Sequence, residues 1–247
     1  MWLRIGSIAG AVAIWWLLSL LLPANIMPSP ASATTTLLAD IAEGEVWSHL
    51  AITLVRVVGG LLLAMLIGVP VGVLMGANHR AERFFDIWVM VALTVPSLCY
   101  AIICFIVFGL NEVAAIIAIA LTAAPSITIN LWEGVKTVDS KLLQMARAYE
   151  ADRWVLFSRV LLPQVLPYVM ASFRFGLGII WKITVLVELL GRPNGVGFKL
   201  FYWYQLADME QVLAWTLLFT VIMLFIELVI LKRVESWLFG WRPRVSV

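Results

Sequence analysis

The sequence predicts an all-α membrane protein with about six transmembrane helices and a charged cytoplasmic helix between the fourth and fifth spans. Of its 247 residues, 63% are hydrophobic and only 13% are charged, and the mean hydropathy is +1.00. Soluble domains have roughly 45–50% apolar and about 25% charged residues. The alternation of apolar and polar residues that is typical of strands is absent, so closed helices are the expected spanning form.

Six apolar segments reach the roughly 20 residues that a spanning helix requires. They lie at about 5–22, 54–75, 87–108, 113–131, 170–190 and 212–231. Little chain remains for a separate soluble domain. We therefore expect one transmembrane domain over 1–247, made of a first span with a periplasmic loop (1–50), a core (51–231) and a cytoplasmic tail (232–247).

The first segment is expected to stay in the chain as a span. Arg4, an apolar run and then Ala31-Ser32-Ala33 together look like a signal peptide. The run is longer than the usual length of about 7–15 residues, however, and the Ala-x-Ala lies well past its end. An uncleaved first span is therefore the preferred interpretation.

The second segment carries a stripe of small residues. Gly68, Gly72 and Gly76 recur at four-residue spacing and fall on one helix face. Such a face lets another backbone approach closely in lipid, so we expect a helix contact there. Pro70 lies inside the same segment; a kinked helix beside a pore and a tolerated proline in an ordinary span are both open interpretations.

Polar residues interrupt the third and fourth segments. Thr94, Pro96 and Ser97 lie within the third segment, and Asn130 lies near the inner end of the fourth. Each is a candidate for lining a cavity, and packing is an equally good explanation.

No metal site is predicted. Cys99 and Cys104 are five residues apart on different faces of one apolar helix, as expected for packing residues rather than for a disulfide or a metal site. His49 and His79 fall at segment edges, with no cluster of acidic residues or cysteines near them.

The basic residues set the orientation. Twelve of them lie at the N-terminus or in the second, fourth and final hydrophilic segments, whereas the other side of the membrane has Arg192 and Lys199 alone. Cytoplasmic connections retain Lys and Arg. Both termini, and the charged segment 142–168, are therefore expected in the cytoplasm.

The charged segment is amphipathic. Asp139 can cap a helix that begins at Ser140. Helical spacing gathers one apolar face, in one element or two short ones: Leu142, Met145, Ala146, Tyr149, Trp154, Phe157, Val160 and Leu161. Pro163 and Pro167 are expected to end it. An interfacial helix, a solvated loop and a helix folded onto the protein's own underside are all open interpretations.

Charged residues inside spans need a partner or a cavity, because a charge near a helix centre costs about 2.5–3.5 kcal/mol on insertion scales. Lys182 is a candidate for lining a path for an anion; snorkelling or pairing with a carboxylate is the alternative. Glu188 lies on a different face and is expected to order the loop that follows it rather than touch substrate. Arg56 and Arg174 are expected to be snorkelled or paired, with Glu227 as a possible acceptor.

The spacing within the charged segment resembles the cytoplasmic loop found in the membrane subunits of bacterial ATP-driven importers. That loop has the pattern Glu-Ala-Ala, three residues, Gly, nine residues, Ile, one residue, Leu-Pro. The corresponding positions here are Gln144-Met145-Ala146, Glu150, Val160 and Leu162-Pro163. The alanine, the Leu-Pro pair and all the spacings match.

Further stretches extend this resemblance over almost the whole chain, and most closely to permeases for nitrate, alkanesulfonates, taurine and bicarbonate. They are MPSP at 27–30, RAERFFD at 80–86, GVKTVDSKLLQMAR at 134–147, VLLPQVLPYVMASFRFGLGIIW at 160–181 and ELLGRPNGVGF at 188–198. Each stretch alone is a weak signal; in this order and at these separations they are specific.

The resemblance implies a permease subunit of the bacterial inner membrane that works by alternating access. The chain has no G-x-x-x-x-G-K-[ST] loop, so it is not expected to be an enzyme, and ATP and Mg would bind in a partner ATPase. The implied partners are a cytoplasmic ATP-binding-cassette ATPase, an extracytoplasmic substrate-binding protein on the loops 23–49 and 192–210, a second copy of the permease and membrane lipid. No cofactor and no nucleic acid is implied.

The resemblance also supplies candidate site residues. The expected coupling helix, which would dock on the ATPase, comprises Gln144, Met145, Ala146, Arg147, Glu150, Ala151, Arg153, Leu162 and Pro163. The candidate translocation path comprises Thr94, Pro96, Ser97, Asn130, Trp181, Lys182 and Glu188.

Two departures from the family pattern matter. Glu150 stands where a glycine is usual, so either the turn stays in an ordinary helical region or Glu150 points into the partner. Lys182 stands where an uncharged residue is usual, which leaves the substrate open.

Two other functional classes remain as alternatives. A self-contained secondary transporter or channel could use an intramembrane lysine with carboxylates, although it would leave the loop spacing unexplained. An intramembrane enzyme would need a nucleophile and a base, or metal ligands, within the spans, and neither histidine lies there.

Overall fold

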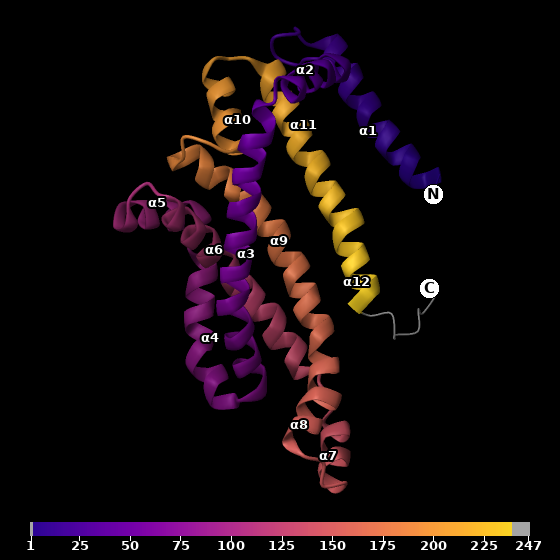
Figure 1. The fold of residues 1–247 in the computed structure, drawn as a ribbon, viewed down its shortest axis with the longest axis vertical. Coiled ribbons are helices and arrows are strands. Elements are labelled where there is room, and N and C mark those ends of the chain that lie inside the picture. The colour runs from indigo at the N-terminus through magenta and orange to yellow at the C-terminus, as the bar shows by residue number, and fades with distance from the viewer. Residues whose placement is uncertain (1, 239–247) are drawn as a thin grey trace. The chain divides into compact units, whose positions relative to one another are not determined.

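The computed structural model describes residues 2–238, with the side chains of 2–5, 140, 147 and 238 left out. The predicted side-chain roles of Arg4 and Arg147, and the predicted tail beyond Leu238, therefore lie outside the described residues. Within the described range the chain is helical and contains no strand. The elements are α1 (Trp2–Leu21), α2 (Pro30–Glu43), α3 (Glu45–Ala77), α4 (His79–Thr94), α5 (Ser97–Phe108), α6 (Glu112–Lys136), α7 (Ser140–Ala148), α8 (Arg153–Val155), the π-helical segment η1 (Leu156–Leu161), α9 (Leu162–Gly191), α10 (Val196–Gln205), α11 (Met209–Phe225), the π-helical segment η2 (Ile226–Leu231) and α12 (Lys232–Leu238) (Figure 1).

The chain forms two compact units. A central unit is the continuous stretch Val55–Val187, and a terminal unit combines the described parts of Met1–Leu54 and Glu188–Val247. Helices α3 and α9 each begin in one unit and end in the other. The division into 1–50, 51–231 and 232–247 stays a prediction.

The predicted glycine stripe is a helix contact in the central unit, between α3 and α6. A Cβ on Gly68 would lie 2.9 Å from the carbonyl oxygen of Ala124, and a Cβ on Gly72 would lie 2.6 Å from that of Thr128. The facing side of α6 is rich in buried alanine, which also permits a close approach. Small residues on both helices thus bring the two backbones together, as expected for packing in lipid.

The third apolar segment is not one straight span. It forms α4 and α5, which are bent by 94° at a short break. Pro96 explains the break, because a proline lacks an N–H and biases the preceding residue away from the helical region. Val95 indeed has extended backbone angles, φ −70° and ψ 123°. The expectation that Thr94, Pro96 and Ser97 interrupt this segment is confirmed, and a span at 87–108 stays a prediction, bent rather than straight.

The structure does not confirm a count of six spans. Three described helices are long and apolar enough to cross a membrane, Glu45–Ala77, Glu112–Lys136 and Met209–Trp237, or up to four if the bent pair α4 and α5 is one span. The apolar part of the first helix, Gly6–Leu21, is shorter than these. Arg174, Lys182 and Glu188 interrupt the apolar sequence of α9. The count of about six therefore remains a prediction, while the all-α membrane fold is established.

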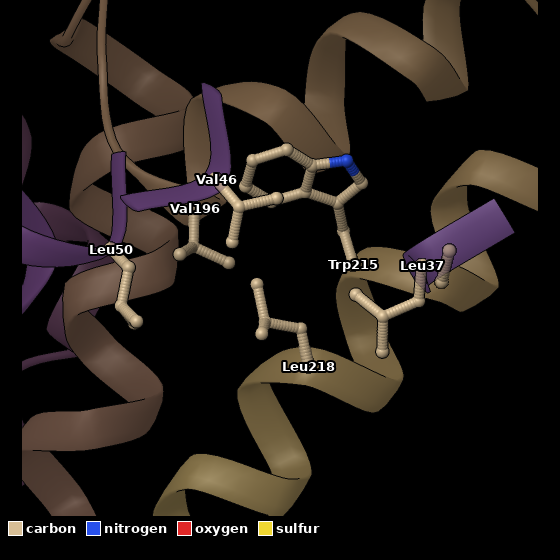
Figure 2. Packing of buried hydrophobic residues seen from close by; sticks show 7 residues of the cluster. Leu37, Val46, Leu50, Val196, Trp215 and Leu218 are labelled. Atoms are coloured by element: carbon tan, nitrogen blue, oxygen red, sulfur yellow. The ribbon is translucent and has the colours of Figure 1, made fainter. Parts of the chain in front are cut away.

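The terminal unit has its own hydrophobic core. Figure 2 shows side chains from four helices that point toward one another. The buried members are Leu37, Val46, Leu50, Val196, Ala214, Trp215 and Leu218. Trp215 is only 2% exposed, and helices α2 and α10 both pack against α11, which carries it. Residues from both ends of the sequence thus share one core.

An ion pair between a buried arginine and a half-exposed carboxylate joins α3 to α6 in the central unit. Arg56 is fully buried, and its Nε and Nη2 atoms donate to the two carboxylate oxygens of Glu112 at 2.7 and 2.8 Å. The expectation that Arg56 is paired is confirmed, with Glu112 as an acceptor that was not foreseen, while the role of Glu227 as an acceptor stays a prediction. Glu112 follows the N-cap Asn111 at the start of α6, where a carboxylate is also favoured by the helix dipole.

Candidate functional site

The charged segment begins as predicted, with a helix capped by Asp139. Helix α7 starts at Ser140, and the Asp139 side chain accepts the Lys141 N–H at 2.8 Å. The Asp139 N–H in turn donates to the side chain of Gln164, near the start of α9, at 2.9 Å. The Thr137 hydroxyl lies 2.6 Å from the Tyr168 hydroxyl. These contacts close the base of a hairpin formed by α7, α8 and the start of α9.

Glu150 forms the sharp turn of this hairpin. Its φ of 50° lies in the left-handed region, and the Ala151 N–H donates to the Ala146 carbonyl at 3.0 Å. This is the bond of a Schellman motif, whose left-handed position is usually a glycine. The interpretation that the turn stays in an ordinary helical region is therefore wrong. Glu150 takes the glycine conformation despite its side chain, at a cost of about 1–2 kcal/mol.

The two prolines do not end the helix that follows the turn. Helix α8 passes through η1 into α9, which contains both Pro163 and Pro167 and continues to Gly191. In the π-helical segment the Leu162 N–H donates to the Phe157 carbonyl, five residues back. This register shift falls directly before Pro163, where a proline would otherwise break the ladder. The prediction that the prolines terminate the element is thus corrected.

The predicted apolar face of the hairpin is largely exposed. Met145 is 53% exposed, Tyr149 82%, Trp154 70% and Phe157 49%, whereas Ala146 is buried. An interpretation in which this face folds onto the protein's own underside is not supported. Exposed aromatic residues grouped with charged neighbours are typical of a protein interaction site.

The other predicted coupling residues lie on the same hairpin. Gln144, Arg153 and Leu162 are exposed, and Ala151 and Pro163 are half-buried. The Asp152 side chain accepts the Trp154 N–H at 3.3 Å and so caps α8. The hairpin thus brings the predicted coupling residues with described side chains together.

The candidate path residues are more scattered. Thr94, Pro96 and Ser97 meet at the α4–α5 elbow, and Thr94 donates to its own helix at the Val91 carbonyl, 2.8 Å away. Asn130 is exposed on α6 and donates to the Ser126 carbonyl at 2.9 Å. On α9, Trp181 is buried and Lys182 is exposed. Among the interactions described for the central unit, none joins Asn130 or Lys182 to the elbow.

Glu188 belongs to a buried polar cluster in the terminal unit. Its carboxylate accepts the Thr53 hydroxyl at 2.8 Å and the Gly197 N–H at 2.8 Å, and Glu188 and Thr53 are both fully buried. The Val196 N–H donates to Thr53 Oγ1, and the Gly195 N–H donates to His49 Nδ1, both at 2.9 Å. The structure therefore supports the expectation that Glu188 orders the loop that follows it.

Sequence reasoning missed most of this cluster. Lys199 entered the sequence analysis only in the count of basic residues, yet it is 7% exposed and pairs with Glu45 beside the rings of Tyr202, Trp203 and Trp215. The signal that could have found it is the four-residue spacing of Glu45, His49 and Thr53, which places three polar side chains on one face of an apolar helix.

Comparison with known proteins identifies the kind of membrane protein. The family described as "Binding-protein-dependent transport system inner membrane component" matches residues 65–238, which include the whole hairpin. The chain is 32% identical over 233 residues to SsuC of Bacillus subtilis, named for aliphatic sulfonates transport, covering 94% of this chain and 84% of that protein.

Two further relatives are similar over most of their length. The taurine transport system permease TauC of Escherichia coli is 28% identical, covering 99% of this chain and 91% of TauC. The bicarbonate transport system permease CmpB of Synechococcus elongatus is 28% identical, covering 81% of this chain and 70% of CmpB.

These matches agree with the resemblance carried by the hairpin spacing, and they cover far more than half of the chain. An all-helical membrane fold, a capped hairpin with an exposed aromatic face and the family match over residues 65–238 all point to one assignment. The chain belongs to the family of binding-protein-dependent transport system inner membrane components, the permease subunits of ATP-binding-cassette importers.

Proposed function

We propose that this permease subunit carries a small anion, of the sulfonate or bicarbonate class, into the cell by alternating access. The relatives named for aliphatic sulfonates, taurine and bicarbonate support the class of substrate. Lys182, exposed on α9 and flanked by buried residues, supports a path that favours negative charge.

The observation that carries the coupling proposal is the exposed aromatic face of the hairpin. Tyr149 and Trp154 are 82% and 70% exposed on either side of the Glu150 turn. We assign this face to the cytoplasmic ATPase, because a soluble partner would cover the rings while Arg153 and Asp152 remain at a polar rim. ATP and Mg would bind in that partner, and nucleotide-driven closure would reach the spans through α8 and α9, which are continuous.

The topology in the membrane follows from the distribution of the basic residues along the chain. Both termini would lie in the cytoplasm and the chain would lie in the bacterial inner membrane, in contact with lipid. A substrate-binding protein would dock on the extracytoplasmic side, and two copies of the permease would pair. The chain itself would have no enzymatic activity and no cofactor.

The test is purification of the tagged chain from its native membrane, with identification of the proteins that remain bound. We expect an ATP-binding-cassette ATPase in comparable amount, lost when Tyr149→Asp and Trp154→Asp are combined. Trp237→Asp, which changes an equally exposed tryptophan on α12, is the matched control and should retain the ATPase. ATP-dependent uptake of ethanesulfonate, taurine and bicarbonate into vesicles then identifies the substrate. Recovery of the chain alone, with uptake that needs no ATP, would favour a secondary transporter.

A further inference from the structure

The start of α10 is capped by side chains from other helices. Its N-cap residue is Gly195, with φ 108°, which has no side chain to accept the first free N–H groups of the helix. Three consecutive backbone N–H groups, those of Gly195, Val196 and Gly197, donate instead to acceptors on α3 and α9. Side chains on other helices therefore provide the hydrogen-bond acceptors that a Ser or Asp at the N-cap normally provides.

The acceptors are chemically matched to this place. The Glu188 carboxylate lies at the positive end of the α10 dipole, where a negative charge is favoured. Thr53 links two of the bonds, because its oxygen accepts the Val196 N–H while its hydroxyl donates to Glu188. A Cβ on Gly195 would overlap the Glu188 carboxylate, so the glycine makes room for that acceptor.

The position of Glu188 gives this cluster a mechanical consequence. Glu188 lies in the last turn of α9, the helix that continues from the hairpin through η1. After Gly191, only a short loop leads to α10, whose far end presents Tyr204 and Leu206, 66% and 57% exposed. Within the terminal unit, the Glu188 contacts are therefore a direct noncovalent link between the end of α9 and the start of α10, stiffer than a flexible loop.

We propose that Glu188 is a positioning residue that, together with Thr53, clamps the start of α10 to α9 and α3 and so conveys engagement of the extracytoplasmic binding protein to the spans. This rests on the proposed function, since α10 lies in the region assigned to that partner. Glu188 touches no substrate in this role. It sets how strongly the partner's arrival stimulates ATP hydrolysis.

The clamp itself is tested first, by amide hydrogen exchange on the full-length permease as purified, with whatever subunits stay bound to it. Glu188→Gln and Thr53→Val should speed exchange at Gly195–Gly197 at least about tenfold, while the amides of α6 stay unchanged. Thr53→Ser, which keeps the hydroxyl, should exchange like the unaltered protein. Unchanged exchange at Gly195–Gly197 in Glu188→Gln would overturn the clamp. This measurement needs neither substrate nor binding protein, so it stands even if the proposed function fails.

The positioning role is tested by ATP hydrolysis of the complex in liposomes, with and without its binding protein and with ethanesulfonate as the probe ligand. Glu188→Gln and Thr53→Val should keep basal hydrolysis and lose most of the stimulation, whereas Thr53→Ser and the exposed-carboxyl control Glu133→Gln, outside the loops assigned to the binding protein, should keep both. Full stimulation despite faster exchange would overturn the role. A parallel loss of basal hydrolysis and assembly in both clamp variants would overturn it too, by assigning a purely structural function. If the unaltered chain brings no ATPase with it, the proposed function fails and the exchange result is unaffected.

Discussion

At the scale of single residues, two side-chain-bearing positions adopt a glycine conformation. Glu150 has φ 50° and Ala207 has φ 56°, and each follows the end of a helix. In both places an N–H donates five residues back, from Ala151 to Ala146 and from Asp208 to Trp203. The hydrogen bonds of the two Schellman motifs outweigh the left-handed strain at each site.

Glu150→Gly is therefore expected to stabilise the hairpin. Glycine relieves the left-handed strain of the folded turn, about 1–2 kcal/mol, and this outweighs the greater conformational entropy that glycine gives the unfolded chain. The expected net stabilisation is about 0.5–1 kcal/mol. The Ala151 amide should exchange about two- to fivefold more slowly. Ala148→Gly is the control, because it introduces a glycine at an ordinary helical position of α7. It should speed exchange of the Ala151 amide, since glycine has a lower helix propensity than alanine. Faster exchange in Glu150→Gly would mean that the glutamate side chain holds the turn through contacts of its own.

Residues also show where sequence reasoning stops. The cap at Asp139 could be predicted because it depends on neighbours along the chain. The partner of Arg56 could not, because Glu112 is 56 residues away and Glu227 was an equally reasonable acceptor. Glu188 was expected to order its loop. Its contact with Thr53 could not be predicted, because the two residues are 135 positions apart and no local sequence pattern indicates the contact.

At the scale of helices, the glycine stripe was predictable and the breaks were only partly so. Four-residue spacing of glycine predicts a close contact whatever the partner helix, and α6 supplies it. Pro96 breaks its segment, whereas Pro163 and Pro167 lie within a continuous helix. The difference is that a π-helical turn shifts the hydrogen-bond register directly before Pro163, and the sequence pattern did not predict that turn.

The stripe makes a prediction about two otherwise similar glycines. A Cβ at Gly72 would come within 2.6 Å of the Thr128 carbonyl, backbone that cannot move cheaply, whereas Gly178 on α9 has nothing within 4 Å. Gly72→Ala should lower the free energy of unfolding in detergent by about 1–3 kcal/mol. Gly178→Ala, the control, should be neutral or raise it by up to about 1 kcal/mol through helix propensity. Equal effects at both positions would show that the α3–α6 contact is looser than the structure describes.

At the scale of the whole molecule, composition predicted a helical membrane protein but not the two units, and the orientation inferred from the basic residues stays a prediction. The terminal core gathers Leu37, Val46, Val196 and Trp215, which lie far apart in sequence (Figure 2). Apolar segments of similar hydropathy do not specify which of them pack together, because any of them satisfies lipid equally well. Which helices pair is decided by side-chain shape and by buried polar contacts, and these cannot be inferred from a single sequence.

Replacement of Lys182 is expected to affect stability and transport differently, and the effect on transport can be measured only in the assembled transporter. Lys182 is exposed on a helix of otherwise apolar surroundings, where a charge facing lipid costs about 2.5–3.5 kcal/mol. Lys182→Met should therefore leave the isolated permease as stable as before or more stable. Transport of the anion in the assembled importer should fall about tenfold or more, since a bond to a charged group contributes about 1.5–3 kcal/mol. Lys182→Arg should retain most transport because it keeps the charge.

The effects of Lys182→Met on uptake and on stability distinguish a lysine that lines the cavity from one that snorkels. Vesicle uptake and unfolding in detergent are measured on the same preparations, with Lys232→Met on α12 as a control for loss of one exposed positive charge. A cavity lysine lowers uptake at unchanged assembly, because the anion loses its partner while the fold loses nothing. A snorkelled lysine changes stability and leaves uptake alone. Unchanged uptake in Lys182→Met would thus remove Lys182 from the path and return the selection of negative charge to backbone dipoles or to the binding protein.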